Sequence, residues 1–97
     1  MASFETQAST CKVIGRLTQQ EVIALWPRRA ELLTASTQVL DLSELDYSDS
    51  AGVSFLLALV QIVERSGRSL QLYAPSSQLL KLIELYDLQA FFTQEVH

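Results

Sequence analysis

The sequence predicts a single α/β domain over residues 1–97, in which a mixed sheet packs against about three to four helices. Strand-like and helix-like segments alternate from residue 10 onwards, an order typical of right-handed crossovers between parallel strands. A short polar turn joins the first two strand-like segments, which favours an antiparallel or mixed edge. The expected sheet therefore has a parallel core and an antiparallel N-terminal edge, and the chain length leaves room for one hydrophobic core.

The N-terminal edge is predicted from two segments separated by small polar residues. Residues 10–17 alternate β-branched and apolar side chains with charged ones, as in a half-buried strand. Residues 4–6 form a weaker strand before it, and residues 7–9 supply the turn of a hairpin. Cys11 has no second Cys and no metal-spaced His beside it, so we expect a small buried strand residue.

A first helix is predicted to begin after Thr18. Thr18 and Glu21 have the spacing of a capping box, which satisfies the first amides of a helix. Pro27 cannot donate its amide, so we expect a kink, or a fresh helix start, just after Trp26. Trp26 has two interpretations, a core residue or an anchor in a protein interface. The predicted apolar face contains Val22, Leu25, Trp26, Ala30 and Leu33.

The middle of the chain is predicted to hold the central strand and a buried helix. Residues 37–43 are apolar apart from Asp41, as in a strand covered on both faces. A carboxylate there is costly unless it is hydrogen-bonded, so Asp41 is expected to accept amides of the following loop. A polar bend that contains Asp46, Ser48, Asp49 and Ser50 is predicted to follow. The helix over residues 50–66 is apolar on several sides and ends at Gly67, where a positive φ is accessible.

The last part of the chain is predicted to add a strand and a third helix. Residues 69–74 alternate as a strand, and after Pro75 either Ser76 or Ser77 caps the helix. Residues 88–92 are expected to close the core or to add a short edge strand. The apolar residues of the third helix are Leu79, Leu80, Leu82, Ile83 and Tyr86.

The polar residues before the second helix are the candidate site, because functional residues in such sheets gather at the carboxyl ends of strands. Asp49 or Ser50 is expected to cap the helix. Catalysis is disfavoured, because the single histidine is the terminal His97 and no feature sets Asp46 or Asp49 apart as an acid. A glycine-rich phosphate loop is also missing from the sequence. We therefore predict no catalytic residue, no metal and no cofactor.

Composition points to a protein partner. The net charge is −4 without a basic stripe, which disfavours nucleic acid and anionic lipid as partners and fits a protein with a basic face. A hydrophobic fraction of 48% predicts that some apolar surface meets that partner. The apolar run over residues 51–63 is shorter than the ~17–25 residues that span a membrane. Residues 1–10 lack the pattern of a signal peptide, so we expect a cytosolic chain.

The stretches VLDLSELDYSDSAGVSFLL and LQLYAPSSQLLKLIELYDL, with the order of elements, resemble the STAS domain. This is the fold of bacterial anti-sigma-factor antagonists and of the cytoplasmic tails of sulfate transporters. The likeness covers nearly the whole chain, and its most specific part is a strand followed by Asp49, Ser50, Ala51 and Gly52. TQQEVIALW and LIELYDL further resemble the STAS subunits of Mla phospholipid-transport ABC complexes of Gram-negative bacteria.

This resemblance implies a non-catalytic cytoplasmic subunit, peripheral to the inner membrane, that helps to maintain the lipid asymmetry of the outer membrane. It would bind the transporter ATPase (MlaF-like) within a complex that also holds permease (MlaE-like) and lipid-binding (MlaD-like) subunits. It would handle no lipid itself and would not insert into the membrane. The residues expected to contact the partner are Trp26, Asp49, Ser50, Ala51, Val53 and Ser54.

The alternative within the same family is an anti-sigma-factor antagonist that acts by partner switching. In those proteins the phosphorylated serine normally lies directly before the glycine, and here that position is Ala51, which has no hydroxyl. Ser50 next to it remains a candidate for phosphorylation, because the start of a helix tolerates a phosphate. The residues favour the transporter subunit. A third class, a small nucleotide-binding or hydrolytic protein, stays open.

Overall fold

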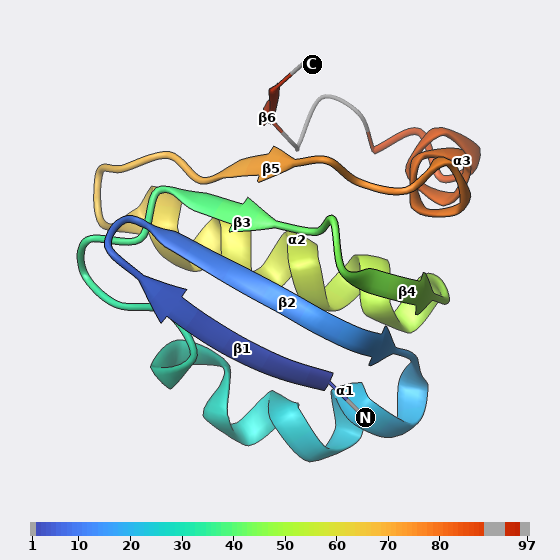
Figure 1. The fold of residues 1–97 in the computed structure, drawn as a ribbon, viewed down its shortest axis with the longest axis horizontal. Helices are drawn as coiled ribbons and strands as arrows, with labels where there is room; N and C mark the ends of the chain where they lie inside the picture. Colours follow the sequence, from blue (N-terminus) through green and yellow to red (C-terminus); the bar gives the residue numbers. More distant parts are fainter. Residues whose placement is uncertain (1, 89–92, 96–97) are drawn as a thin grey trace.

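The computed structural model describes residues 2–88 and 93–95, and its elements follow an α/β order (Figure 1). The strands are β1 (Ala2–Gln7), β2 (Thr10–Leu17), β3 (Val39–Asp41), β4 (Leu45–Ser48), β5 (Gln71–Tyr73) and β6 (Thr93–Glu95). The helices are α1 (Gln19–Leu25), the 3-10 helix η1 (Trp26–Glu31), α2 (Ser50–Arg65) and α3 (Ser77–Leu85).

The described strands form one mixed sheet in the order β1-β2-β3-β5-β6, and β4 pairs with the second half of β2. β1 and β2 are antiparallel, whereas the pairs in the rest of the sheet are parallel. In Figure 1, α2 lies behind β2 and β3, and α1 runs beside it. The predicted parallel core with an antiparallel N-terminal edge is confirmed.

The N-terminal hairpin is longer than the sequence predicted. β2 has the predicted bounds, but β1 pairs with it along six residues, from Ala2 opposite Gly15 to Gln7 opposite Thr10. The turn is shorter than predicted, because Gln7 pairs with Thr10 and leaves residues 8–9 to join the two strands. Cys11 is fully buried, as expected, and burial raises the pKa of its thiol.

The central strand differs from the prediction. β3 stops at Asp41, whose carboxylate accepts from the Ser43 amide (2.9 Å) and turns the chain. The expected role of Asp41 in orienting the following loop is thus confirmed. The chain then resumes as β4, which continues along β2 in the same direction as β3. The prediction of a polar bend was wrong for Asp46 and Ser48, which belong to β4, where Leu45 and Ser48 are buried.

α2 supplies the centre of the core. It covers the predicted helix to within one residue. Seven of its residues are buried, among them Phe55 and Leu59. These residues pack with the inward-facing residues of β2, β3 and β5 in one cluster. The chain leaves the helix through Gly67 at φ +84°, the conformation for which glycine was expected.

α1 and η1 are anchored only in part. The Glu21 carboxylate accepts from the Thr18 amide (2.8 Å) and hydroxyl (2.5 Å), in agreement with the capping-box spacing. η1 begins at Trp26, one residue before the predicted break, with Pro27 in its first turn, where a missing amide costs little. Neither helix contains a fully buried residue. Four side chains pack partly against the core: Val22, Leu25, Leu32 and Leu33.

The C-terminal part agrees with the prediction except at its end. β5 is shorter than residues 69–74, and Ser76 caps α3 by accepting from the Leu79 amide at 3.1 Å. Leu79 and Ile83 are buried, but Tyr86 is 49% exposed and does not belong to the core. The prediction for residues 88–92 falls on a segment whose last four residues lie outside the described chain.

Candidate functional site

Three helices begin at one edge of the sheet. α1 follows β2, α2 follows β4 and α3 follows β5, and these three strands are parallel to one another through β3. Their carboxyl ends therefore deliver three helix N-termini to the same side of the molecule, the right side in Figure 1. Residues 49–54, which the sequence singled out, lie at this edge.

Asp49 bonds to the first amides of two helices. Its Oδ1 accepts from the Gly52 amide at 3.0 Å and so caps α2, as predicted. Its Oδ2 accepts from the amide of Gln19, the first residue of α1, also at 3.0 Å. This second bond joins residues 30 positions apart in the sequence, and no local pattern could have indicated it.

Gly52 allows α2 to approach the end of β2. A Cβ at this position would collide with the Leu17 carbonyl oxygen and with the Ser48 hydroxyl oxygen. The Ser48 hydroxyl is fully buried and lies 3.1 Å from the Leu17 carbonyl oxygen, to which it donates. The sequence motif contained Gly52, but the reason for it, a backbone contact between a helix and a distant strand, becomes visible only in the fold.

The start of α3 is bonded to the same edge. The Gln78 side chain accepts from the Ser48 amide (3.2 Å) and donates to the Ser48 carbonyl oxygen (2.6 Å). This reciprocal pair fixes α3 to the end of β4. The edge is therefore held by side chains that bond to backbone groups of neighbouring elements.

The candidate residues of α2 divide between the surface and the core. Ser50 and Ser54 are exposed and lie one helical turn apart. Ala51 is half-buried and shares a flank of α2 with Phe55, four residues further along. Val53 is 1% exposed and lies in the core, so its side chain supports α2 from inside.

Trp26 lies between the two interpretations that the sequence left open. Its ring packs against Phe55 with a centroid distance of 6.1 Å, yet 43% of the residue is exposed. The Arg29 guanidinium lies 4.2 Å from the ring centroid, and its Nη1 donates to the Trp26 carbonyl oxygen at 2.7 Å. The indole is thus held in place between Phe55 and Arg29 while part of it faces solvent.

Ile23 is a surface residue that the sequence analysis missed. It is 67% exposed and precedes Trp26 by three residues, so the two lie on one side of α1. The available signal was its position outside the predicted apolar face of the helix. We define the α1–α2 surface as Ile23, Trp26, Ser50, Ala51 and Ser54.

Glu21 fixes the charge at the start of α1. Hydrogen bonds from the Thr18 hydroxyl and amide lower the pKa of Glu21 from 4.5 to about 2. The carboxylate is therefore ionised at neutral pH. A negative charge in the first turn also interacts favourably with the helix dipole.

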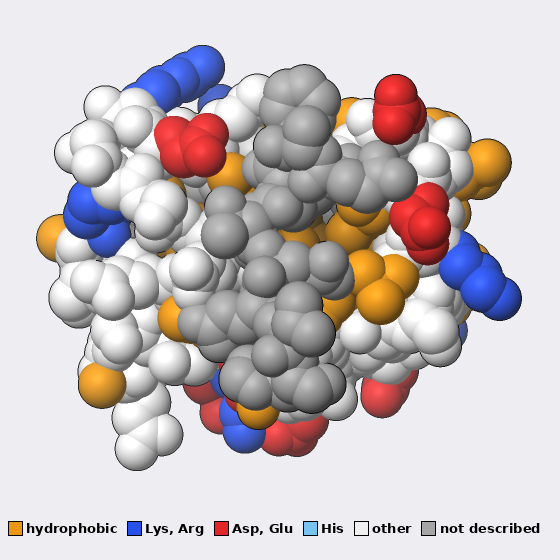
Figure 2. Space-filling model, turned by 90° about the horizontal axis from the view of Figure 1, so that it is seen from above, with side chains coloured by type: hydrophobic (Ala, Val, Ile, Leu, Met, Phe, Trp, Pro, Cys, Tyr) orange, Lys and Arg blue, Asp and Glu red, His pale blue; other side chains and the backbone are white. Residues whose placement is uncertain are grey.

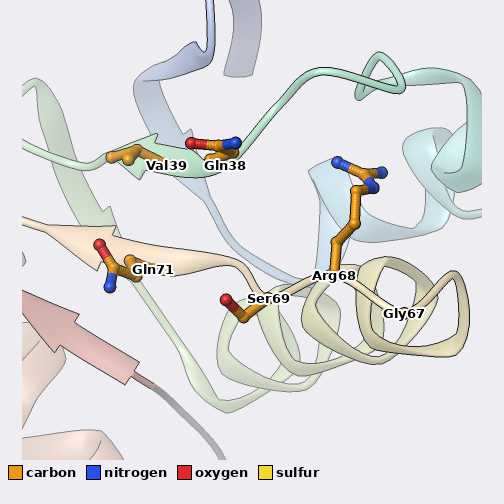
Figure 3. Close-up of a pocket in the computed structure, with 6 residues that line it drawn as sticks. All are labelled: Gln38, Val39, Gly67, Arg68, Ser69 and Gln71. Atoms are coloured by element: carbon orange, nitrogen blue, oxygen red, sulfur yellow. The ribbon is translucent and has the colours of Figure 1, made fainter.

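The opposite edge of the sheet has a hollow of about 440 Å³ between the starts of β3 and β5 (Figure 3). Arg68 lines it, but its Nη1 donates to the Thr37 carbonyl oxygen (2.8 Å) and its Nε to the Ser66 hydroxyl (3.2 Å). Figure 3 shows Arg68 pointing in a different direction from Ser69 and Gln71. The side chains do not converge on one point, so we assign no ligand site here.

The side chains described at this edge are better suited to binding a partner than to catalysing a reaction. Both Asp49 oxygens accept from helix amides, and Ser50 and Ser54 present hydroxyls beside apolar groups. No cluster of metal-binding side chains was found in residues 2–88 and 93–95. Even the longest helix of the described chain falls short of a membrane span. On the face seen in Figure 2, acidic and basic side chains are interspersed rather than segregated.

Two curated relatives resemble this chain over most of their length. The intermembrane phospholipid transport system binding protein MlaB of Escherichia coli is 28% identical over 88 residues, which cover 91% of this chain and 90% of that protein. The protein of the same name from Haemophilus influenzae is 29% identical and covers 91% of this chain and 92% of its own length. Both relatives are binding proteins of a transport system by name.

Solved structures support the fold. The anti-sigma factor antagonist SpoIIAA in its unphosphorylated form superimposes with a TM-score of 0.70, at 16% identity, over 100% of this chain and 90% of its own. SpoIIAA from Bacillus in the phosphorylated form gives 0.65, with coverages of 100% and 93% and the same identity. At this identity the likeness establishes the SpoIIAA-like α/β fold. A family model described as Mlab, STAS domain matches residues 1–93, and this chain therefore belongs to the MlaB-type STAS family.

Proposed function

We propose that this chain is a non-catalytic subunit of an Mla-type phospholipid-transport ABC complex and binds the transporter ATPase through the α1–α2 surface. In this role it supports the assembly or activity of the complex, which also holds permease and lipid-binding subunits. It lies in the cytoplasm, peripheral to the inner membrane, and contributes to outer-membrane lipid asymmetry. Lipid is handled by the other subunits.

The observation that carries the proposal is the exposure of Ile23 and Trp26 on a helix without a fully buried residue. A helix that contributes so little to the core and still exposes two large apolar side chains is suited to a protein interface. Trp is enriched among the residues that dominate binding energy. The contact with Phe55 holds the indole in one orientation, which lowers the entropy cost of binding.

Family membership supports the transporter role over the antagonist role. The relatives that align over 91% of the chain carry names from phospholipid transport, whereas the SpoIIAA likeness extends to the fold alone. Ala51 occupies the position at which the antagonists carry their phosphorylated serine, so partner switching at that position lacks its hydroxyl. Phosphorylation of the neighbouring Ser50 would place a charge within the α1–α2 surface and should weaken an apolar interface.

Affinity for the Mla-type ATPase of the same organism tests the proposal. Removing a buried interface Trp commonly costs at least ~2 kcal/mol, so Trp26→Ala should bind about thirtyfold more weakly than the parent. Ser50→Glu should also bind more weakly, because it adds a charge to a surface that loses water on binding. Circular dichroism verifies that each variant folds.

Tyr86→Ala is the matched control, because Tyr86 is an aromatic residue of similar exposure directly after α3, outside the α1–α2 surface. It should bind like the parent. If Trp26→Ala and Ser50→Glu fold and keep the parental affinity, the ATPase binds elsewhere. A parent that does not bind the ATPase at all overturns the transporter role. The purified chain should also hydrolyse neither ATP nor GTP; turnover that is lost on changing Asp49 or Ser50 would contradict the non-catalytic role.

A further inference from the structure

We propose that Asp49 is a positioning residue whose carboxylate holds α1 beside α2 for partner binding. This inference rests on the proposed function. The two hydrogen bonds of Asp49 go to different helices, one to the Gly52 amide of α2 and one to the Gln19 amide of α1, both at 3.0 Å. We call this pair of bonds the Asp49 bridge. Both carboxylate oxygens of Asp49 thus accept from backbone amides of the two helices, while the residues beside Asp49 face the partner.

The position of α1 depends on few contacts. No α1 residue is fully buried, so the core alone does not determine where the helix lies along α2. At its start the Asp49 bridge joins Gln19 to the N-terminus of α2. At its end Trp26 packs against the Phe55 ring. These two contacts, one at each end, add to the partial packing of Val22 and Leu25 against the core and hold α1 beside α2.

The bond from α1 is stronger than a neutral pair because its acceptor is a carboxylate. The same charge lies at the positive end of two helix dipoles, since α1 and α2 both begin there. Loss of the bond should allow the first turn of α1 to move away from α2. Ile23 and Trp26 would then reach the partner in several arrangements, and binding would have to select one of them.

Two single variants remove the bond to α1 from opposite sides. Asp49→Asn keeps an N-cap for α2, because Asn caps helices as well as Asp, but its amide nitrogen cannot accept from Gln19. Gln19→Pro removes the donor; Pro is favoured at the first position of a helix, and the preceding Thr18 has the extended backbone that Pro requires. Each variant should lower ATPase affinity about tenfold.

The double variant separates positioning from direct contact. If both changes remove the same bond, the double variant should bind no more weakly than either single variant. If Asp49 instead contacts the ATPase directly, its change and that of Gln19 should add, which would overturn the inference. Ser76→Ala is the stability control, because it removes the N-cap of α3 without touching α1. It should lower stability and leave the affinity unchanged.

Amide hydrogen exchange on the isolated chain supplies a readout that does not require the ATPase. Exchange over residues 20–25 should rise about tenfold in Asp49→Asn and Gln19→Pro, while exchange in α3 stays parental. Ser76→Ala should show the reverse. Parental exchange of α1 in both variants overturns the Asp49 bridge. Faster exchange with unchanged affinity overturns its role in binding. If the parent fails to bind the ATPase, the proposed function is wrong, and the exchange result alone supports or overturns the bridge.

Discussion

α1 and α2 begin at the same edge of the sheet and lie side by side, but they are held in different ways. α2 buries seven residues and forms the centre of the core, whereas α1 has none that is fully buried. α1 is held instead by the partial packing of Val22 and Leu25, by the bond from Gln19 to Asp49 at its start and by one aromatic contact at its end. Two neighbouring helices of one small domain thus have different tasks, one in the core and one at the surface.

In a domain of this size, recognition residues can lie on a helix that the core does not require. Residues of α2 that face the sheet cannot change without loss of the core, so they leave few positions for recognition. α1 can expose Ile23 and Trp26 because the core does not depend on them. The two helices are nevertheless linked, since Phe55 of α2 supports Trp26 and Asp49 bonds to Gln19.

The largest expected effect is the loss of stability in Phe55→Ala. Phe55 is fully buried and touches the rings of Phe4 and Trp26, so its removal should lower the free energy of unfolding by about 3–5 kcal/mol. Ile23→Ala is the matched change on α1 and should stay within about 0.5 kcal/mol of the parent. Urea denaturation measures both. Similar losses for the two variants would remove the contrast between the helices.

The next effect concerns the packing of α2 against β2. Gly52→Ala places a Cβ against the Leu17 carbonyl oxygen and the Ser48 hydroxyl, and should cost about 3 kcal/mol because backbone must move. Gly67→Ala is its control, since Gly67 has open space but a positive φ, which should cost about 1–2 kcal/mol. Chemical denaturation of both variants checks this order. A Gly52→Ala protein as stable as the parent would show that α2 can shift without cost.

A smaller effect is the stabilisation of the domain by its partner. A partner that binds only the folded chain adds about 2.7 kcal/mol at a concentration of one hundred times Kd. The melting midpoint should therefore rise with the ATPase for the parent, and rise less for Trp26→Ala at the same concentration. The measurement is thermal melting of the mixture, monitored by a signal that comes from this domain alone. An unchanged midpoint at saturating ATPase would count against partner stabilisation.

The smallest effect is a loosening of α1 in acid. Because the Glu21 pKa is lowered in the folded chain from 4.5 to about 2, its stabilising contribution is complete above pH 4.5 and is lost as the pH falls towards 2. Trp26 is the single Trp of the sequence and follows the last residue of α1, so its fluorescence reports whether a change at the start of the helix reaches its other end. Glu21→Gln should lack the transition. Identical acid profiles for the parent and the variant would contradict the assignment.

Local patterns in the sequence predicted the features that depend on neighbouring residues. The capping of α1 by Thr18 and Glu21, of α2 by Asp49 and of α3 by Ser76 follows from spacings of three residues. The fold class followed from the order of strands and helices. These predictions succeed because a helix start is satisfied within its own first turn.

Features that depend on distant residues were missed. β4 contains two exposed residues between Leu45 and Ser48 and becomes a strand because it pairs with β2. The bond between Asp49 and Gln19 and the close approach at Gly52 join segments about thirty residues apart. Ile23 was missed because periodicity indicates which residues share the apolar face, but does not show which apolar residues outside that face lie next to an exposed Trp26.

The central claim is that the ATPase covers the α1–α2 surface, and amide hydrogen exchange with and without the ATPase tests it most directly. We expect slower exchange over Gln19–Leu25 in the complex, together with protection at the start of α2 around Ser50 and Ser54. Amides of β1 and α3 should exchange at their original rates. Protection confined to β1 or α3, with α1 unchanged by saturating ATPase, would contradict the account.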